Sequence, residues 1–281
     1  MEFKLVAVGK TKRGVLSKLF QDFKWNYLAD SVLDGYMGEA FVDNQDNPNI
    51  AVLEAPELKL IIIGGDPGHP SARKYLESLV ATKLIIFTSE EWEGLMREIH
   101  KGRLVLIPRY VLSSEKLDIT HLNELVSRLP EGYSLKRMDV EIAQRLANEE
   151  SEFSSDHMIF FESLEDFVAR GFGFCVLYGD EVVCAATTFA VCNQGIEIQI
   201  STREKHRRRG LATAVAAQLL IHSLENKLDP NWDAANKMSV GLAEKLGYVP
   251  KGTYSIYIFV RSRFKAVYGK VLLKTLELLK K

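Results

Sequence analysis

One stretch of the chain, residues 195–226, constrains the fold more than any other, because a strand, a short basic loop and a long apolar helix follow one another in it. In the strand, polar residues alternate with Ile196, Ile198 and Ile200, which predicts one buried face and an end near Thr202. The loop carries three consecutive arginines, and Gly210 opens the helix. A strand that leads through a short loop into a helix is the building unit of a sheet covered by helices.

The junction between this loop and its helix is suited to bind phosphate. The first turn of a helix has backbone N–H groups without partners and the positive end of the helix dipole. Arg207, Arg208 and Arg209 add charge, and Gly210 lets the backbone approach a ligand closely. The first turn continues with small side chains and one hydroxyl, at Ala212, Thr213 and Ala214. A solvated basic turn before a helix would explain this segment alone equally well.

A second segment strengthens the reading as a ligand site. The stretch NWDAANKMSVGLAEKLGYVPKG begins about 25 residues beyond the loop. Asn236 is a good helix cap, and Gly247 is a good helix stop. The two segments therefore predict a second strand–helix unit after the first.

Together the two segments resemble the signatures of the GNAT superfamily of N-acetyltransferases. The loop Arg207-Arg208-Arg209-Gly210-Leu211-Ala212 matches the pyrophosphate pattern R-x-x-G-x-A. In the second segment the matching positions are Asn236, Ser239, Leu242, Leu246, Gly247 and Tyr248. The resemblance covers residues 133–260, and the wording of the second segment is also similar to the subgroup of zwittermicin A self-resistance acetyltransferases.

This resemblance implies acetyl-CoA as co-substrate and a set of binding positions. In the family, the central strand separates from its neighbour before the loop, and freed backbone groups bind the pantetheine arm. Those groups correspond here to Ile200 and Thr202, and Asn236 would lie near the pantetheine and thiol. The implied binding residues in the loop, the first helical turn and the second segment are Arg207, Arg208, Arg209, Gly210, Leu211, Ala212, Thr213, Asn236 and Ser239.

The catalytic residues are predicted less directly. Glu197 is the candidate general base, because it lies on the strand where the family often places a carboxylate and alternates with the isoleucines. It could equally be part of a polar strand face. The position where the family often has an acidic tyrosine is Ala243, so Ser239, Tyr254 or a water would have to replace it, and we expect Tyr248 in the core.

The remaining elements indicate an α/β fold with a mixed sheet and two domains. A chain of 281 residues suggests two domains at roughly 150 residues each. We expect an N-terminal α/β accessory domain at 1–128, with early strands that resemble a degenerate GNAT-like half, and a GNAT domain at 129–281. Its apolar C-terminal segment 262–281 is expected to pack as a helix on its own domain. A single helix is predicted over 14–30, and GGDPGHPS (64–71) is read as a turn between strand and helix.

Composition excludes several other classes. The formal net charge is −1, so the chain has no global field that attracts nucleic acid or membrane, and the short run KHRRRG is a weak nucleic-acid signal. No apolar run approaches the roughly 18 residues that a membrane-spanning helix needs, and the start is unlike an export signal. Cys175, Cys184 and Cys192 are expected to be reduced core thiols, which suits the cytoplasm, and no metal-ligand spacing occurs.

These observations favour an acetyl-CoA-dependent N-acetyltransferase that acts on a primary amine of a small molecule. The alternative is a non-catalytic acyl-CoA-binding regulatory module, which the alanine at 243 motivates. We expect no metal, no nucleic-acid partner and no membrane partner, and a homodimer is left open.

Overall fold

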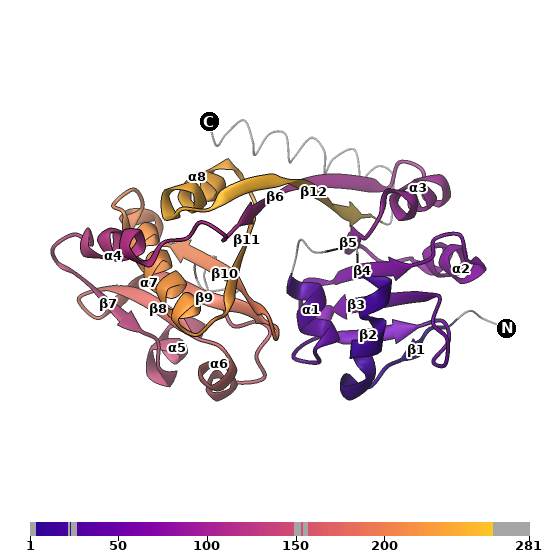
Figure 1. Ribbon diagram of the computed structural model, residues 1–281, viewed down its shortest axis with the longest axis horizontal. Coiled ribbons are helices and arrows are strands. Elements are labelled where there is room, and N and C mark those ends of the chain that lie inside the picture. The colour runs from indigo at the N-terminus through magenta and orange to yellow at the C-terminus, as the bar shows by residue number, and fades with distance from the viewer. Residues whose placement is uncertain (1–3, 22, 24–26, 149–152, 154–156, 261–281) are drawn as a thin grey trace. The chain divides into compact units, whose positions relative to one another are not determined.

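The computed structural model describes residues 4–21, 23, 27–148, 153 and 157–260, and these form two compact units (Figure 1). The first unit comprises Met1–Lys24, Val32–Pro108 and Tyr254–Lys281. The second comprises Trp25–Ser31 and Arg109–Thr253. The C-terminal helix predicted over 262–281 lies outside the described residues.

In the first unit, the sheet has the strand order β1–β2–β3–β4–β5–β12. Its strands are β1 (Val6–Ala7), β2 (Glu39–Val42), β3 (Ile50–Ala55), β4 (Leu60–Gly65), β5 (Lys83–Phe87) and the end of β12 (Val249–Phe259). The ladder between β4 and β5 is parallel, because helix α2 (Pro70–Ser78) carries the chain back between them. Helix α3 (Glu90–Ile99) follows, and its Trp92 and Met96 are fully buried in the core of this unit.

The prediction of a single helix over 14–30 is wrong. The chain forms a 3₁₀ helix at Lys10–Leu19, and α1 begins only at Tyr27 (Tyr27–Leu33). After the 3₁₀ helix the chain lies against β4 so closely that a Cβ atom at Gly64 would be 2.6 Å from Leu19 O and from the Phe20 ring. Leu16 and Phe20 are buried, as in an amphipathic helix, but here no continuous α-helix carries them.

In the second unit, the sheet has the strand order β6–β11–β10–β9–β8–β7. Its strands are β6 (Leu104–Ser113), β7 (Tyr133–Arg137), β8 (Gly173–Tyr178), β9 (Glu181–Val191), β10 (Gly195–Thr202) and β11 (Asp229–Ala234). Of β6, only the part from Arg109 onward belongs to this unit. A tight hairpin at Gly179-Asp180 joins β8 to β9. Strands β10 and β11 are parallel, and the long helix α7 (Leu211–Glu225) connects them.

Helices cover both faces of this second sheet. Phe174 and Val176 of β8 share a core with α4 (Ile119–Ser127), α7 and α8 (Lys237–Leu246). The alternate residues Cys175 and Leu177 pack instead against α5 (Val140–Ala147) and α6 (Leu164–Arg170). The predicted mixed α/β fold is therefore confirmed. Cys175, Cys184 and Cys192 are buried thiols, as expected.

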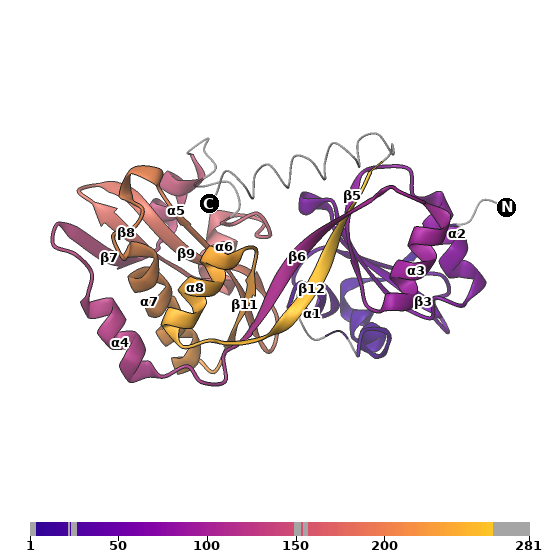
Figure 2. The same ribbon diagram turned by 90° about the horizontal axis from the view of Figure 1, so that it is seen from above.

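Two strands, β6 and β12, each pair with a strand that comes from the other half of the sequence. Strand β6 follows α3 in sequence, but its residues Tyr110–Leu112 pair with β11 of the second unit. Strand β12 follows α8, but its residues Ile256–Phe259 pair with β5 of the first unit. Figure 2 shows β6 and β12 as two long strands, each of which has residues in both units. Each sheet is thus completed by a strand from the other half of the sequence.

The packing units divide the chain differently from the domains expected at 1–128 and 129–281. Residues 109–128 pack with the second unit, where Leu122 and Leu125 of α4 lie in the α7 core. The described residues 254–260 pack with the first unit. The predicted domains are contiguous pieces of sequence, whereas the packed units exchange strands.

Candidate active site

A fork between two strands lies at the centre of the second unit. The parallel ladder of β10 and β11 joins Gly195, Ile196 and Glu197 to residues 229–231, and it ends there. Beyond that point β10 stays paired with β9 as far as Thr202, whereas β11 pairs with β6. A β-bulge between Glu197 and Ile198 marks the place where the strands separate. The fork exposes one edge of β10 that β11 no longer covers.

The backbone of β10 turns alternate residues toward this open edge. Arg203 N donates to Val183 O on β9 at 2.9 Å. Because backbone groups alternate along a strand, Ser201 also turns toward β9, and Ile200 and Thr202 turn toward the open edge. Arg207 Nε donates to Thr202 O at 3.2 Å. The geometry is thus compatible with the predicted pantetheine contacts at Ile200 and Thr202, which remain a prediction.

The basic loop follows directly, and α7 begins at its end. Arg208 and Gly210 have left-handed backbone conformations, with φ of 61° and 81°, so a glycine is favoured at 210. No side chain caps the N-terminus of α7, and a Cβ atom at Gly210 would meet no atom within 4 Å. The other predicted loop residues are placed as follows: Arg207 and Arg209 are exposed, Ala212 and Thr213 half-buried, and Leu211 buried. This helix end therefore presents N–H donors on an open side.

Aromatic residues hold the loop in a way that the sequence did not indicate. Tyr133 Oη and His206 Nδ1 are 2.9 Å apart in a hydrogen bond. The Tyr178 ring lies against both, with its centroid 5.2 Å from that of Tyr133 and 5.4 Å from that of His206. Two tyrosines from β7 and β8 thus anchor the loop to the sheet.

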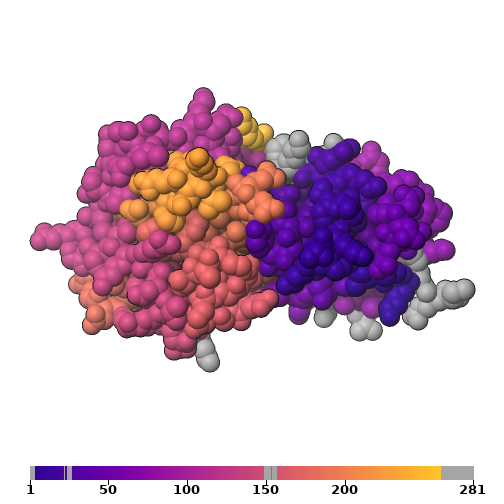
Figure 3. Space-filling model, turned by 60° about the horizontal axis from the view of Figure 1, so that its bottom comes forward, coloured from indigo at the N-terminus to yellow at the C-terminus, as the bar shows by residue number. Residues whose placement is uncertain are grey.

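Helix α8 has the ends that the sequence predicts. Asn236 caps it, because its Oδ1 accepts from Ser239 N at 3.0 Å, and Gly247 ends it with φ of 105°. Ser239 Oγ in turn accepts from Trp232 Nε1 at 3.0 Å. Met238 is 69% exposed, and the yellow-orange atoms of this helix lie on the surface of the second unit in Figure 3.

The positions considered for the general acid differ in environment. Ala243 is fully buried in the core. Tyr248 is also buried and donates to Pro230 O at 2.6 Å, so its interpretation as a core residue is confirmed. Tyr254 belongs to the first unit, where its ring meets Phe23 edge to face at 6.3 Å.

The Glu197 side chain lies at the base of the fork. It points away from the isoleucine face, as its alternation predicts: Ile196 is buried against α7, while Glu197 bonds elsewhere. Its Oε1 accepts from Tyr27 N at 2.6 Å and from Asn231 Nδ2 at 2.7 Å. The residue is only 5% exposed.

Burial raises the pKa of Glu197 to about 8, and the negative charge of Asp233 adds to the rise. The hydrogen bonds from Asn231 and Tyr27 and the charge of Arg109 act in the opposite direction. A carboxyl group with a pKa close to physiological pH is suited to accept and release protons.

Two aspartates of β11 surround this group and have their own partners. Asp233 forms an ion pair with Arg109, with Nη2 and Oδ2 3.0 Å apart. Asp229 accepts from Tyr27 Oη at 2.6 Å and also forms a short hydrogen bond with Ser114 Oγ. The site is thus a buried polar network that joins α1, β6, β10 and β11.

His157, which the sequence gave no reason to select, is buried beside β10. Its Nδ1 lies 2.8 Å from Thr187 Oγ1 and its Nε2 lies 2.6 Å from Ser201 Oγ. Ser201 Oγ donates to Phe153 O at 2.7 Å. Burial lowers the pKa of His157 to about 4, so the ring is neutral at physiological pH. His157 thus forms hydrogen bonds to both β9 and β10.

The low pKa of His157 predicts an acid-sensitive fold. Between about pH 6.5 and 4 the unfolded chain binds a proton at this residue that the folded chain does not, so the free energy of unfolding falls as the pH falls. We expect a loss of up to about 3 kcal/mol in this window. Urea titrations at several pH values should show this dependence in the wild type and in the control His121→Gln, which replaces a half-buried histidine elsewhere in the second unit. An equal dependence in His157→Gln would contradict the assignment.

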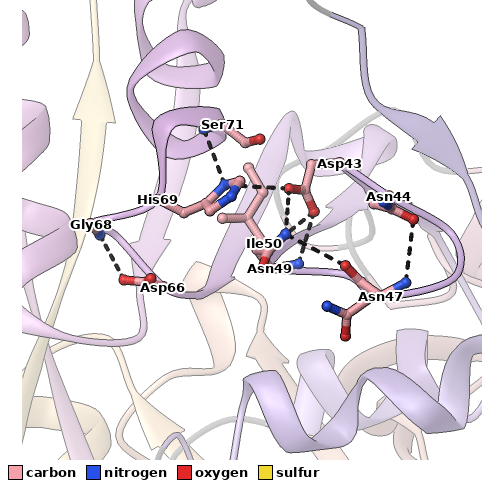
Figure 4. Close-up of polar contacts among 9 residues, drawn as sticks. All are labelled: Asp43, Asn44, Asn47, Asn49, Ile50, Asp66, Gly68, His69 and Ser71. Carbon is pink, nitrogen blue, oxygen red and sulfur yellow. Dashed lines mark hydrogen bonds and ion pairs between the residues drawn. The ribbon is translucent and has the colours of Figure 1, made fainter.

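The first unit also has a strand–loop–helix segment, but there side chains of the protein itself accept hydrogen bonds from the backbone N–H groups of the loop and of the first helical turn (Figure 4). Asp66 Oδ1 accepts from Gly68 N at 2.8 Å, and His69 caps α2 by accepting from Ser71 N at 3.3 Å. Asp43 Oδ2 lies 3.5 Å from His69 Nδ1. The β4–β5 ladder also stays closed through Ile63 and Phe87. The reading of 64–71 as a turn between strand and helix is confirmed.

The described part of the chain lacks two further kinds of feature. No cluster of histidine, cysteine, aspartate or glutamate there could hold a metal ion. No helix in that part is long and apolar enough to cross a membrane.

Comparison with known proteins identifies the family. The model of the family described as GNAT acetyltransferase matches residues 17–257. The chain is 29% identical over 258 residues to the uncharacterized N-acetyltransferase YdfB of Bacillus subtilis (strain 168), which covers 88% of this chain and 96% of that protein. A GCN5-related N-acetyltransferase-like protein from Streptococcus suis 89/1591 superimposes with a TM-score of 0.76 at 30% identity, covering 89% of this chain and 100% of that one.

The chain therefore belongs to the GNAT acetyltransferase family, and the family match spans both units. A tandem GNAT protein from the clavulanic acid biosynthesis pathway shares the fold, with a TM-score of 0.60 at 11% identity, over 91% of this chain and 97% of that one. The resemblance seen in the sequence is thus confirmed at the level of the superfamily.

Proposed function

We propose that the chain transfers the acetyl group of acetyl-CoA to a primary amine of a small molecule. The observation that carries this proposal is the open β10 edge placed directly before an uncapped helix N-terminus with three arginines. The backbone of Ile200 and Thr202 would bind the pantetheine arm as an added strand does. The first turn of α7, together with Arg207, Arg208 and Arg209, would bind the diphosphate.

The reaction in this proposal is direct attack of the amine on the thioester. The Glu197 carboxylate first takes one proton from the ammonium group. The uncharged nitrogen then forms a bond to the acetyl carbonyl carbon, the C–S bond breaks, and the second proton that leaves the nitrogen passes through water to the departing thiolate. An amine of pKa about 10.4 is rarely uncharged at pH 7. Removing its proton at this pH costs roughly 4.6 kcal/mol, so a base is useful. Because Glu197 is 5% exposed, we place one water between it and the amine.

The departing thiolate needs less help than the amine. Thiols have a pKa of about 8.5, well below that of an amine, so a thiolate leaves readily and can take its proton from water. This accounts for a buried alanine at position 243, where the family often has a tyrosine. Positioning of the amine beside the thioester can supply roughly 7–11 kcal/mol, more than one proton donor contributes.

The nature of the acceptor rests on the closer resemblance to the zwittermicin A self-resistance subgroup. The residues PNWDAAN and LAEKLGY support a small-molecule amine and a detoxifying role in the cytoplasm. A panel of amines assayed for thiol release from acetyl-CoA tests this part of the proposal, and activity confined to protein or peptide amines would contradict it.

A non-catalytic acyl-CoA-binding module is the second candidate. The burial of Glu197 and of Ala243 favours it, because neither side chain is presented to solvent. Tight binding of acetyl-CoA without thiol release across the amine panel would support this candidate over the enzyme.

The loop assignment has its own test. Acetyl-CoA at about 100 times its dissociation constant should stabilise the fold by roughly 2.7 kcal/mol and raise Tm by several degrees. Arg209→Glu combined with Gly210→Glu should abolish this shift, because a carboxylate repels the diphosphate and Gly210 has φ of 81°. The matched control is Gly68→Glu in the loop of the first unit, which should keep the full shift. An unchanged shift in the double variant would refute the assignment.

A further inference from the structure

Tyr27 bonds to both strands at the base of the fork. Its N–H donates to Glu197 Oε1 on β10 at 2.6 Å, and its phenol donates to Asp229 Oδ2 on β11 at 2.6 Å. These partners lie 170 and 202 residues away in sequence. One residue from the N-terminal part of the chain therefore connects the two strands where their ladder ends.

The two donors to Glu197 share one oxygen. Tyr27 N and Asn231 Nδ2 both bind Oε1, at 2.6 and 2.7 Å. Because both of these bonds go to Oε1, Oε2 is the carboxyl oxygen left to accept a proton, as far as the described residues show. The two donors from different elements also fix the plane of the carboxyl group.

The geometry points to Tyr27 as a positioning residue for Glu197: its main-chain N–H holds Oε1, and its phenol, anchored on Asp229, holds that N–H in place. This inference rests on the proposed role of Glu197 as the base. Tyr27 does not contact the reacting atoms and acts only through Glu197.

Other charged and titratable groups face the same carboxyl group. Asp233 of β11 and Arg109 of β6 form an ion pair whose members act on the Glu197 pKa in opposite directions. Asp229 is held by Tyr27 and Ser114. Tyr248 donates to Pro230 O, and its pKa is raised by burial. The test must therefore change the Tyr27 N–H and leave these groups in place.

A pair of substitutions isolates that N–H. Tyr27→Pro and Tyr27→Ala both remove the phenol, but only proline removes the donor, and proline is well tolerated in the first turn of a helix. The Glu197 pKa is measured by infrared difference titration, with Glu197→Gln as the reference. Loss of a hydrogen bond to the charged form should make this pKa higher by about one pH unit in Tyr27→Pro than in Tyr27→Ala.

The rate should follow the same shift. At pH 7, kcat of Tyr27→Pro should be about tenfold below that of Tyr27→Ala, because less carboxylate is present, and the two should converge at high pH. The Kd of acetyl-CoA should agree within about twofold between them. If Tyr27→Pro does not fold, as judged by circular dichroism, an ester bond before residue 27, introduced with the hydroxy-acid analogue of tyrosine, removes the N–H alone.

The titration needs no acceptor, so the two proposals can fail separately. A higher pKa in Tyr27→Pro without detectable acetyl transfer would support the positioning role and count against the enzyme. Equal pKa values in the two variants would overturn the positioning role, whether or not transfer is observed.

Discussion

Glu197→Gln is expected to slow acetyl transfer by about 10²–10⁴-fold at pH 8, the usual contribution of a general base. In the wild type the rate should rise with pH and level off near the Glu197 pKa of about 8. Glutamine cannot accept the proton, so this inflection should be missing from the profile of the variant. The measurement is kcat/KM against pH with one amine from the panel.

The same substitution should make the protein more stable at alkaline pH. The folded-state pKa is about 8, above the ordinary glutamate value of 4.5, so the folded chain keeps a proton that the unfolded chain releases. Its stabilising effect is complete below about pH 4.5 and is lost as the pH rises through 8. Glutamine does not titrate, so the free energy of unfolding of the variant, relative to wild type, should increase over this range.

A matched control separates the site from a general loss of charge. Glu54→Gln removes a carboxylate on β3 of the first unit, where Glu54 pairs with Lys83 at 3.1 Å. A half-buried pair of this kind contributes little, and no change in the rate profile is expected. If Glu197→Gln and Glu54→Gln behave alike in rate and in alkaline stability, Glu197 is not the base.

Local chemistry explains what the sequence could predict. Asn236 and Gly247 mark the ends of α8 by capping and by a left-handed backbone, and both effects depend on a few neighbouring residues. The strand, loop and helix of 195–226 are likewise specified by alternation and by Gly210. These signals recur wherever such a unit forms, so the sequence alone places the loop and the start of the helix that follows it.

Long-range contacts explain what the sequence could not predict. Tyr27 meets Glu197 across 170 residues, and His157 meets Ser201 across 44. Neither lies in a motif, because the sheet alone brings the partners together. The failed prediction of a helix over 14–30 has a related cause: the apolar spacing is real, but close packing of Leu19 and Phe20 at Gly64 sets the local conformation.

The sequence also could not predict that β6 and β12 pair with strands from the other half of the chain. The segment Leu104–Ser113 is apolar enough to form a strand, β6, but an apolar segment does not say which strand lies beside it. A contiguous domain boundary at 128/129 follows naturally from such local reading. Because β6 pairs with β11 and β12 pairs with β5, we expect a cut at that position to have a large effect.

The separate fragments 1–128 and 129–281 are expected not to fold cooperatively. Fragment 129–281 lacks Tyr110–Leu112, the ladder partners of β11, as well as the Tyr27 bonds to Glu197 and Asp229. Fragment 1–128 lacks Ile256–Phe259, which cover β5. An uncovered strand exposes backbone donors and acceptors together with apolar side chains, so each fragment should aggregate or melt without a transition.

Fragment 109–253 is the informative control, because it has nearly the same length as 129–281 but retains the strand that completes the second sheet. It should show a thermal transition by circular dichroism and bind acetyl-CoA weakly. Co-expression of 1–128 with 129–281 should restore a stable complex and the full Tm shift, since every ladder can then form. A cooperative transition in 129–281 alone, equal to that of 109–253, would mean that β6 adds little to the fold and that the active half is a self-contained domain.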